Sequence, residues 1–267
     1  DEFLYLNNLN TVISYPKNRI NVLLLESVHP VAVKLMKEEG FNVEVYPAGL
    51  TEDELCEKIA NVSILGIRSK TQVTAKVLEN ANRLMAIGAF CIGTNQIDLD
   101  AASKKGIAVF NAPFSNTRSV VELAIAEIIM LMRNLPDKFA KMHEGSWNKS
   151  ASNSFEIRGK NLGIVGYGSI GSQLSVLAEG LGMKVFYYDT EEKLALGNAT
   201  KCKSLKELLQ VADVVSLHVD GRSSNRHMIG AQELDQMKKG VILLNLSRGH
   251  VVDVKALKER ILDGHIR

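Results

Sequence analysis

The sequence predicts an α/β protein with two doubly wound parallel sheets, and two observations support this. Short apolar runs that read as buried strands alternate with helical stretches along most of the chain. This alternation is typical of parallel sheets whose two faces are covered by helices. In the second half, one such strand runs into three glycines spaced G-x-G-x-x-G, with a helical stretch and another strand behind them. That second half therefore indicates a dinucleotide-binding domain.

The first expected domain covers residues 20–115, after an arm at 1–19 that shows no clean period. Its expected strands cover 20–25, 41–46, 63–67, 84–88 and 107–110. Helices are expected at 30–39, 51–60, from 74 onward and at 98–105. Thr51 fits the capping position of its helix, and Gly40 and Gly106 fit the ends of theirs.

The second expected domain covers residues 116–267. It opens with a long helix at 119–133, which is apolar on most of its circumference, and continues into a loop with Trp147. Its expected strands cover 162–165, 185–189, 214–219 and 241–245, and its further helices follow the glycines and cover 204–210, 232–237 and 253–262.

The glycines predict where a dinucleotide would bind. Gly166 permits the tight turn, Gly168 lets backbone N–H groups approach a pyrophosphate, and Gly171 lets the next helix pack close to the strand. Asp189 ends the following strand, where such units place the carboxylate that binds the adenosine ribose. That carboxylate would repel the extra phosphate of NADP by about 4 kcal/mol at 4 Å. No arginine follows directly after it, so the expected cofactor is NAD.

Three basic residues at the ends of expected strands suggest an anionic ligand. Arg68, Lys70 and Arg248 lie there, and ligands of open α/β sheets bind at that edge. One such residue is most often a solvated surface charge. Three of them beside a cofactor unit favour binding of carboxylate or phosphate groups.

The composition argues against several functional classes. The 267 residues are 46% apolar, with 32 Lys and Arg against 30 Asp and Glu, and contain no basic run of the kind that binds nucleic acid. No stretch fits a membrane span. Three widely separated cysteines fit a reducing compartment without disulfides. We therefore expect a cytoplasmic protein without a metal site and without nucleic-acid or membrane partners.

Four stretches of the sequence resemble the D-2-hydroxyacid dehydrogenases, at 88–98, 110–122, 163–171 and 245–253. The resemblance covers about 20–267 and is greatest to members that act on phosphorylated glycerate. It implies a flavodoxin-like substrate domain, a Rossmann NAD-binding domain and NAD-dependent oxidation of 3-phospho-D-glycerate to 3-phosphooxypyruvate, the first step of L-serine synthesis. Another D-2-hydroxy acid, such as glycerate or lactate, and a non-catalytic NAD-sensing protein similar to a corepressor both stay open.

The resemblance also assigns roles to individual residues. Arg248 would bind the substrate carboxylate and carbonyl during catalysis. Further substrate contacts would come from Arg68, Ser69, Lys70, Asn116 and, from a neighbouring subunit, Lys149. The cofactor would be bound by Gly166, Gly168, Ser169, Ile170, Gly171, Asp189, His218, Val219, Leu246, Ser247 and Arg248. Residues 120–132 and Trp147 would form a homodimer interface, and a tetramer is open for the full-length protein.

The sequence departs from the family pattern near its C-terminal end. The family's proton donor, a histidine oriented by a glutamate, would follow after Arg267, so the 267 residues alone are expected to be inactive. His250 and His265 are alternative candidates, but their positions favour structural roles.

Overall fold

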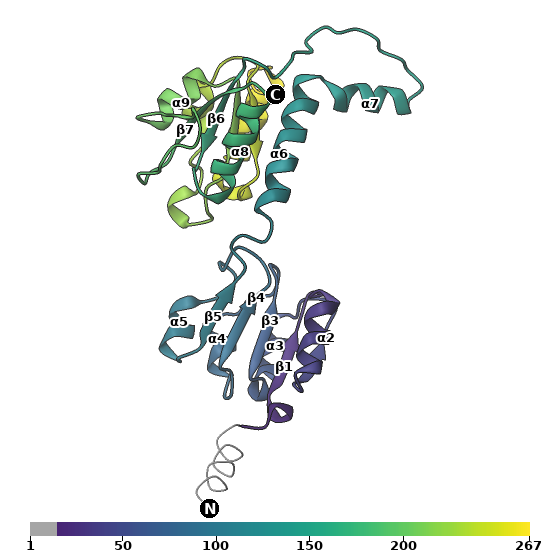
Figure 1. The fold of residues 1–267 in the computed structure, drawn as a ribbon, viewed down its shortest axis with the longest axis vertical. Coiled ribbons are helices and arrows are strands. Elements are labelled where there is room, and N and C mark those ends of the chain that lie inside the picture. The colour runs from purple at the N-terminus through teal and green to yellow at the C-terminus, as the bar shows by residue number, and fades with distance from the viewer. Residues whose placement is uncertain (1–14) are drawn as a thin grey trace, which may run out of the picture. The chain divides into compact units, whose positions relative to one another are not determined.

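The computed structural model describes residues 15–267, which form two compact units. The first unit runs to Ser115 and the second begins at Asn116 (Figure 1). Most of the expected N-terminal arm lies outside the described residues. Its last part contains a short 3-10 turn, η1 (Lys17–Arg19).

The first unit is a five-stranded parallel sheet in the order β2-β1-β3-β4-β5. The strand order reverses between β1 and β3, which is the flavodoxin-like arrangement that the sequence predicts. The strands are β1 (Asn21–Leu24), β2 (Asn42–Val45), β3 (Ile64–Ile67), β4 (Ala86–Ala89) and β5 (Ala108–Asn111). The helices are α2 (Pro30–Glu38), α3 (Glu52–Lys58), α4 (Ala75–Glu79) and α5 (Leu99–Lys104), with a 3-10 turn η2 (Ile59–Asn61).

Both faces of this sheet are covered. On one face Val22 and Leu24 pack with α2, and on the other Leu23 and Leu65 pack with α3, α4 and α5. Helix α3 begins as expected at Thr51, whose hydroxyl accepts from the N–H of Glu54 while the Glu54 carboxylate accepts from the N–H of Thr51.

The second unit is a five-stranded parallel sheet in the order β10-β9-β6-β7-β8, the Rossmann arrangement. Its strands are β6 (Asn161–Val165), β7 (Lys184–Tyr188), β8 (Thr200–Lys201), β9 (Val214–Leu217) and β10 (Ile242–Asn245). Its helices are α6 (Thr117–Met132), α7 (Leu135–His143), α8 (Ser169–Gly180), α9 (Leu205–Val211), α10 (Ala231–Gln236) and α11 (Val254–Leu262), with 3-10 turns η3 (Ser223–Asn225) and η4 (Gly249–Val251).

Alternating residues of β6 build the two layers of this core. Leu162 and Ile164 pack with α6 and α8, whereas Val165 packs with α9 and α10. Helix α9 approaches the sheet closely because Gly163 has no side chain: a Cβ there would lie 2.6 Å from Leu208 Cδ2. The predicted doubly wound fold of both units is confirmed.

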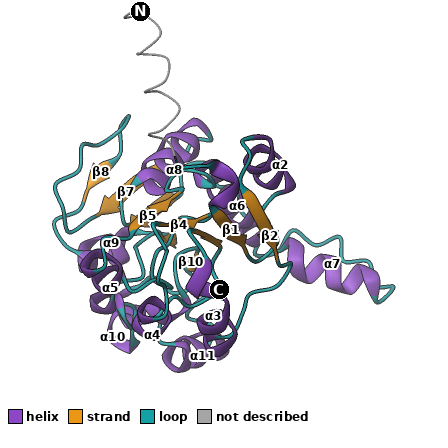
Figure 2. Cartoon of the chain, turned by 90° about the horizontal axis from the view of Figure 1, so that it is seen from below, coloured by secondary structure: helices purple, strands orange, loops and turns teal. Residues whose placement is uncertain are grey.

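Two features of the second unit differ from the sequence prediction. The expected loop after α6 contains a further helix, α7, which begins after Asn134 in a left-handed conformation and has Pro136 in its first turn, where proline is tolerated. The short edge strand β8 also had no periodic signal, because two residues carry no pattern. Helix α7 stands apart from the strands of its unit in both views (Figures 1 and 2).

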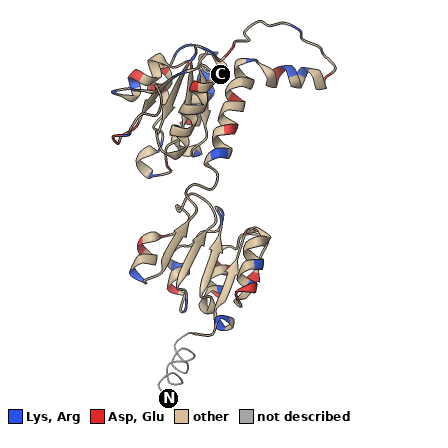
Figure 3. Ribbon diagram, in the orientation of Figure 1, with Lys and Arg blue, Asp and Glu red and all other residues tan. Residues whose placement is uncertain are grey.

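Acidic and basic residues are interspersed over each unit (Figure 3). No helix within residues 15–267 combines the length and the apolar character that a membrane span requires.

Candidate functional site

The three glycines after β6 have three different surroundings. Gly166 has a φ of 92°, which a side chain rarely adopts, and a Cβ there would lie 2.8 Å from the backbone carbonyl group of His218. A Cβ on Gly168 would have no described atom of another segment within 4 Å, so the space above this residue is open. At Gly171 a Cβ would lie 2.3 Å from the carbonyl oxygen of Gly166, so α8 can pack against β6 only with glycine there. These are the turn, the open approach and the close packing that the sequence predicts for a pyrophosphate site.

Helix α8 begins directly at this open space. Gly168 is its capping residue, and Ser169 and Ile170 form its first turn. The first N–H groups of a helix have no acceptor within the helix and carry its positive dipole end. The predicted contacts of Ser169 and Ile170 with a pyrophosphate are consistent with this position and stay a prediction.

Asp189 follows β7 and is fixed by two backbone N–H groups. Its Oδ2 accepts from Tyr167 at 2.7 Å and its Oδ1 accepts from Glu191 at 2.9 Å. Each oxygen keeps a further lone pair for a hydroxyl group. The carboxylate thus links the glycine turn to the strand end and faces the same pocket as the glycines.

That pocket has a volume of about 330 Å³ and lies where the strand order reverses, between β6 and β9. It brings together five of the predicted cofactor residues: Gly166, Gly168, Asp189, His218 and Val219. Ligands of open α/β sheets bind at this reversal point. The pocket therefore has the position and the donors that a dinucleotide requires.

His218 contributes its backbone to the pocket and keeps an uncharged ring. Burial lowers the pKa of its imidazole to about 4. Its Nε2 lies 2.9 Å from Ser216 Oγ, while Nδ1 is buried without a hydrogen-bond partner among the described residues. This ring therefore takes no part in an ion pair with Asp189 at neutral pH.

The structure places in this pocket an arginine that chain order did not reveal. Arg222 lines the pocket together with Asp189, although it lies 33 positions further along the chain. Its Nε lies 2.8 and 2.9 Å from the two carboxylate oxygens of Asp220, which takes up its charge. No arginine follows Asp189 directly in the chain, but the fold brings Arg222 into the same pocket, where its charge is already paired with Asp220.

Arg248 lies beside the same pocket. A Cβ on Gly221 would lie 3.2 Å from Arg248 Cγ, so the arginine stem passes over the loop that carries Val219 and Arg222. The turn after β10 is fixed by Asn245, which donates to the Arg248 carbonyl at 2.9 Å and accepts from the Ser247 N–H at 3.1 Å. The guanidinium is exposed and donates to the Ser247 carbonyl. The predicted catalytic arginine is therefore next to the predicted cofactor pocket.

A second pocket, of about 720 Å³, lies at the ends of β1, β2 and β3 in the first unit. The predicted substrate residues Arg68, Ser69 and Lys70 line it and are exposed. Neither cation forms an ion pair within residues 15–267, so both charges are available to an anion. Glu26 also lines the pocket and was not predicted. The pattern that identified Asp189, an acidic residue at the end of a buried strand, could also have identified Glu26.

The remaining predicted residues are not gathered into either pocket. Asn116 precedes α6 without a side-chain hydrogen bond to the helix, Lys149 is exposed in the segment after α7, and Leu246 packs partly into the core. Where the rings of the other histidines form hydrogen bonds, their partners are backbone groups. His265 Nε2, for example, lies 3.1 Å from the carbonyl oxygens of Leu234 and Met237.

Comparison with known proteins agrees with this geometry. Residues 125–267 match the family model described as the NAD binding domain of D-isomer specific 2-hydroxyacid dehydrogenases. The chain belongs to this family. The second unit is its NAD-binding domain, which confirms the predicted family and the predicted cofactor.

Individual members show how much of the family the chain covers. It is 51% identical over 255 residues to the D-3-phosphoglycerate dehydrogenase of Escherichia coli K12, which is 95% of this chain and 62% of that protein. A crystal structure of a protein from Thermus thermophilus is similar at 31% identity with a TM-score of 0.86, covering 92% of this chain and 79% of the other. The D-lactate dehydrogenase of Aquifex aeolicus, solved with NAD and lactic acid, is 29% identical with a TM-score of 0.81, over 92% and 74%. The chain therefore spans about 62% of the length of this curated relative from Escherichia coli.

Proposed function

We propose that the protein carrying this chain oxidises 3-phospho-D-glycerate to 3-phosphooxypyruvate with NAD. The observation that carries the proposal is the 51% identity to D-3-phosphoglycerate dehydrogenase over 95% of the chain. Two features of the structure support it: the glycine-turn pocket with Asp189, and the separate pocket with two cations that are unpaired within residues 15–267. A substrate with a carboxylate and a phosphate needs such cations.

In this reaction, the residues of this chain would bind the substrate and polarise its C2 oxygen. When bound, NAD supplies the acceptor for the hydride that leaves C2 of the hydroxy acid. Arg248 would bind the carboxylate and the C2 oxygen and would stabilise the carbonyl as it forms. Arg68, Ser69 and Lys70 would bind the phosphate end, with Asn116 and Lys149 as further contacts. No ring nitrogen of the six histidines is hydrogen-bonded to a carboxylate of residues 15–267, so we assign no proton transfer to this chain.

The test uses the complete protein that carries this sequence. NADH formation is followed with 3-phospho-D-glycerate, D-glycerate and D-lactate as alternative substrates. Turnover that prefers the phosphorylated acid supports the proposal. Turnover of only an unphosphorylated acid would assign another substrate, and NAD binding without turnover of any acid would favour a cofactor-sensing role.

Arg248 provides the matching prediction for catalysis. Arg248→Ala should lower kcat/KM at least about a hundredfold, because a charge-assisted bond to the developing carbonyl oxygen is lost. Arg226→Ala removes an exposed arginine of the same unit and serves as the control. Activity of Arg248→Ala within about threefold of the unmodified protein would remove Arg248 from the catalytic site.

We also propose a homodimer and a cytoplasmic location. Exposed apolar side chains on α6 and beyond α7 support the dimer. Three cysteines without a disulfide, Cys56, Cys91 and Cys202, support a reducing compartment.

A further inference from the structure

Glu26 lies at the end of β1, and its carboxylate is hydrogen-bonded to the backbone of another loop. Oε1 accepts from the N–H groups of Thr71 at 2.8 Å and Arg68 at 3.2 Å, and Oε2 accepts from Lys70 at 2.9 Å. Glu26 is 7% exposed. One carboxylate thus binds three N–H groups of the loop that follows β3.

Successive backbone N–H groups that point to one place form an anion-binding site. In this loop that site is filled by the protein's own carboxylate, so the N–H groups of Arg68, Lys70 and Thr71 are not offered to a ligand. The side chains of Arg68 and Lys70 are on the loop's exposed surface, and neither forms an ion pair with Glu26. Any anionic ligand would therefore be bound by the side chains while Glu26 fixes the chain beneath them.

The same loop is fixed from its other side. The carbonyl oxygen of Arg68 accepts from Gln96 Nε2 at 2.8 Å, and Gln96 is 3% exposed. The Arg68 residue is thus bonded through its N–H to Glu26 and through its carbonyl to Gln96. A loop bonded at both faces presents its side chains from one defined backbone conformation.

The backbone around Glu26 is unusual in a way that fits this role. Glu26 and Ser27 have φ values of 62° and 52°, which non-glycine residues adopt only when surrounding contacts hold them there. The Glu26 N–H donates to Ala48 and the Ser27 hydroxyl donates to Pro47, both in the loop after β2. The turn at Glu26 therefore joins all three loops that line the pocket.

The carboxylate remains ionised at neutral pH in this setting. Burial alone would raise its pKa, but the hydrogen bonds from Thr71, Lys70 and Arg68 outweigh burial and lower it. A neutral amide at this position would direct an NH₂ group at backbone donors, which repel it.

We propose that Glu26 is a positioning residue that fixes the loop from Arg68 to Thr71 so that the two cationic side chains meet one phosphorylated carboxylic acid. The substrate class in this statement rests on the proposed function. The geometry distinguishes positioning from a simple effect of charge. A negative charge next to two cations disfavours an anion, so its removal should tighten anion binding if charge alone matters.

The test measures loop order and anion binding on the chain as it is. Amide hydrogen exchange at Arg68, Lys70 and Thr71, and titrations with 3-phospho-D-glycerate and with inorganic phosphate, are compared for the unmodified chain, Glu26→Gln and Glu26→Asp. Glu57→Gln is the control, since it removes one exposed carboxylate of the same unit that has no hydrogen bond to the loop. Glu26→Gln should speed exchange at the three amides at least tenfold and weaken binding of 3-phospho-D-glycerate at least fivefold. Glu57→Gln should change neither.

Glu26→Asp keeps the charge but shortens the side chain, so it should speed amide exchange and weaken binding of 3-phospho-D-glycerate to a smaller extent. It replaces Glu26→Gln as the test variant if Glu26→Gln does not fold. In the complete protein, Glu26→Gln should raise KM for the acid while the Kd for NAD stays unchanged. Unchanged exchange, or equal or tighter anion binding in Glu26→Gln, would overturn the proposal. If the unmodified chain binds inorganic phosphate but not 3-phospho-D-glycerate, the proposed substrate fails, and the effect of Glu26→Gln on phosphate binding still decides the positioning role.

Discussion

Within residues 15–267, Asp189 is the single residue that places an unpaired negative charge in the pocket of the second unit. Its carboxylate bonds to two backbone N–H groups, while the neighbouring carboxylates of Glu191 and Asp220 are paired with Lys193 and Arg222. Asp189 is thus the pocket carboxylate without a cationic partner among the described residues. This charge would oppose a phosphate on the adenosine ribose and leave hydroxyl groups as preferred ligands.

Replacement of Asp189 should reduce the preference for NAD over NADP. Asp189→Ala should weaken NAD binding at least tenfold and reduce the ratio of NAD to NADP affinity, because the ribose loses an acceptor and the phosphate loses a repulsive neighbour. Isothermal titration of both nucleotides measures this. Glu192→Ala, which removes an exposed carboxylate three positions on, should keep the preference. An unchanged ratio in Asp189→Ala would remove it from the adenosine site.

His218 makes the stability of the second unit depend on pH. Its ordinary pKa of 6.5 falls to about 4 in the folded chain because the ring is buried. Between these values the unfolded chain binds a proton that the folded chain does not, so stability should fall as pH falls through this window, by on the order of 3 kcal/mol. The stabilisation from Glu26 and Asp213, whose pKa values are lowered, is lost at more acid pH, as the pH falls below their ordinary values of 4.5 and 3.8.

Denaturant unfolding at several pH values measures this dependence. His218→Gln should flatten the curve of unfolding free energy against pH between pH 6.5 and 4. His143→Gln, on the exposed surface of α7, should leave this curve unchanged. A curve of the same slope in His218→Gln would show that the burial of His218 is not the cause of the dependence between pH 6.5 and 4.

At the scale of elements, the turn between β6 and α8 assigns separate tasks to glycines that look alike in the sequence. Gly171 is required by packing, because a Cβ would meet the Gly166 carbonyl oxygen at 2.3 Å. A Cβ on Gly168 would meet no described atom, and the φ of −83° at this residue is open to any side chain. Gly171 is therefore needed for the fold, and Gly168 is needed only if a ligand occupies the space above it.

Paired alanine variants separate the two tasks. Gly171→Ala should lower the free energy of unfolding by at least about 2 kcal/mol, because backbone has to move. Gly168→Ala should lower it by less than about 1 kcal/mol, mainly through a poorer cap, yet weaken NAD at least tenfold. Thermal unfolding and nucleotide titration report the two effects. Full NAD affinity in Gly168→Ala would mean that the pyrophosphate does not lie there.

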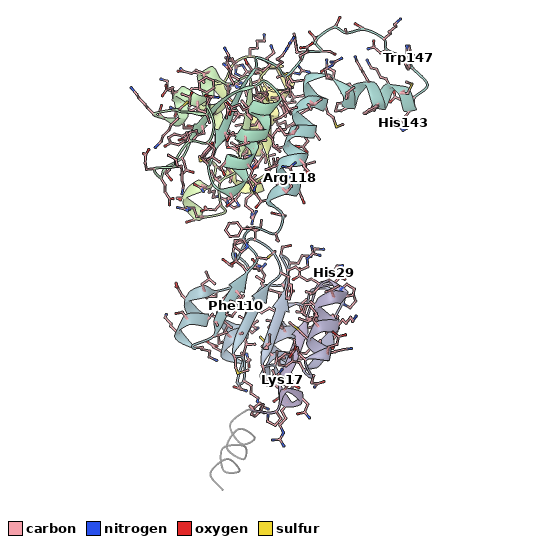
Figure 4. All side chains as sticks on the ribbon, in the orientation of Figure 1. Lys17, His29, Phe110, Arg118, His143 and Trp147 are labelled. Atoms are coloured by element: carbon pink, nitrogen blue, oxygen red, sulfur yellow. The ribbon has the colours of Figure 1, made fainter. Side chains whose placement is uncertain are left out.

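At the scale of the whole molecule, α6 and the segment after α7 carry apolar surface that the second unit leaves uncovered. Val121, Ala124 and Ile128 of α6 are buried, but Leu123 is 49% and Ile129 is 37% exposed. The single tryptophan, Trp147, is 72% exposed and lies beyond the end of α7, away from the sheet of its unit (Figure 4). Such a surface is typical of a subunit contact.

The chain should therefore form a dimer at micromolar concentration, because a two-fold contact covers the same apolar patch on both copies. Trp147→Ala combined with Ile129→Glu should shift sedimentation to the monomer. Leu262→Glu, at a 77% exposed position on α11, is the control and should stay dimeric. A folded chain that stays monomeric, or a dimer indifferent to the double variant, would restrict α6 to a core role.

Strong local patterns explain which elements the sequence predicted. The fully buried β9 and the capping box at Thr51 each carry their signal within a few residues, and both lie where expected. Helix α7 was missed although Leu135, Phe139 and Met142 recur at helical spacing; the helix is short, and none of its residues is buried. The two-residue β8 is too short for any period.

The sequence by itself determined the fold class, the family and the glycine turn with Asp189, because each depends on residues close together in the chain. The tertiary structure decided which distant residues meet. Glu26 reaches the loop of Arg68 across 42 positions, and Arg222 enters the pocket of Asp189, because parallel strands bring their carboxyl ends to one edge of a sheet. Local patterns record what a segment forms, whereas the charges that pair and the loops that a buried carboxylate fixes depend on sheet order.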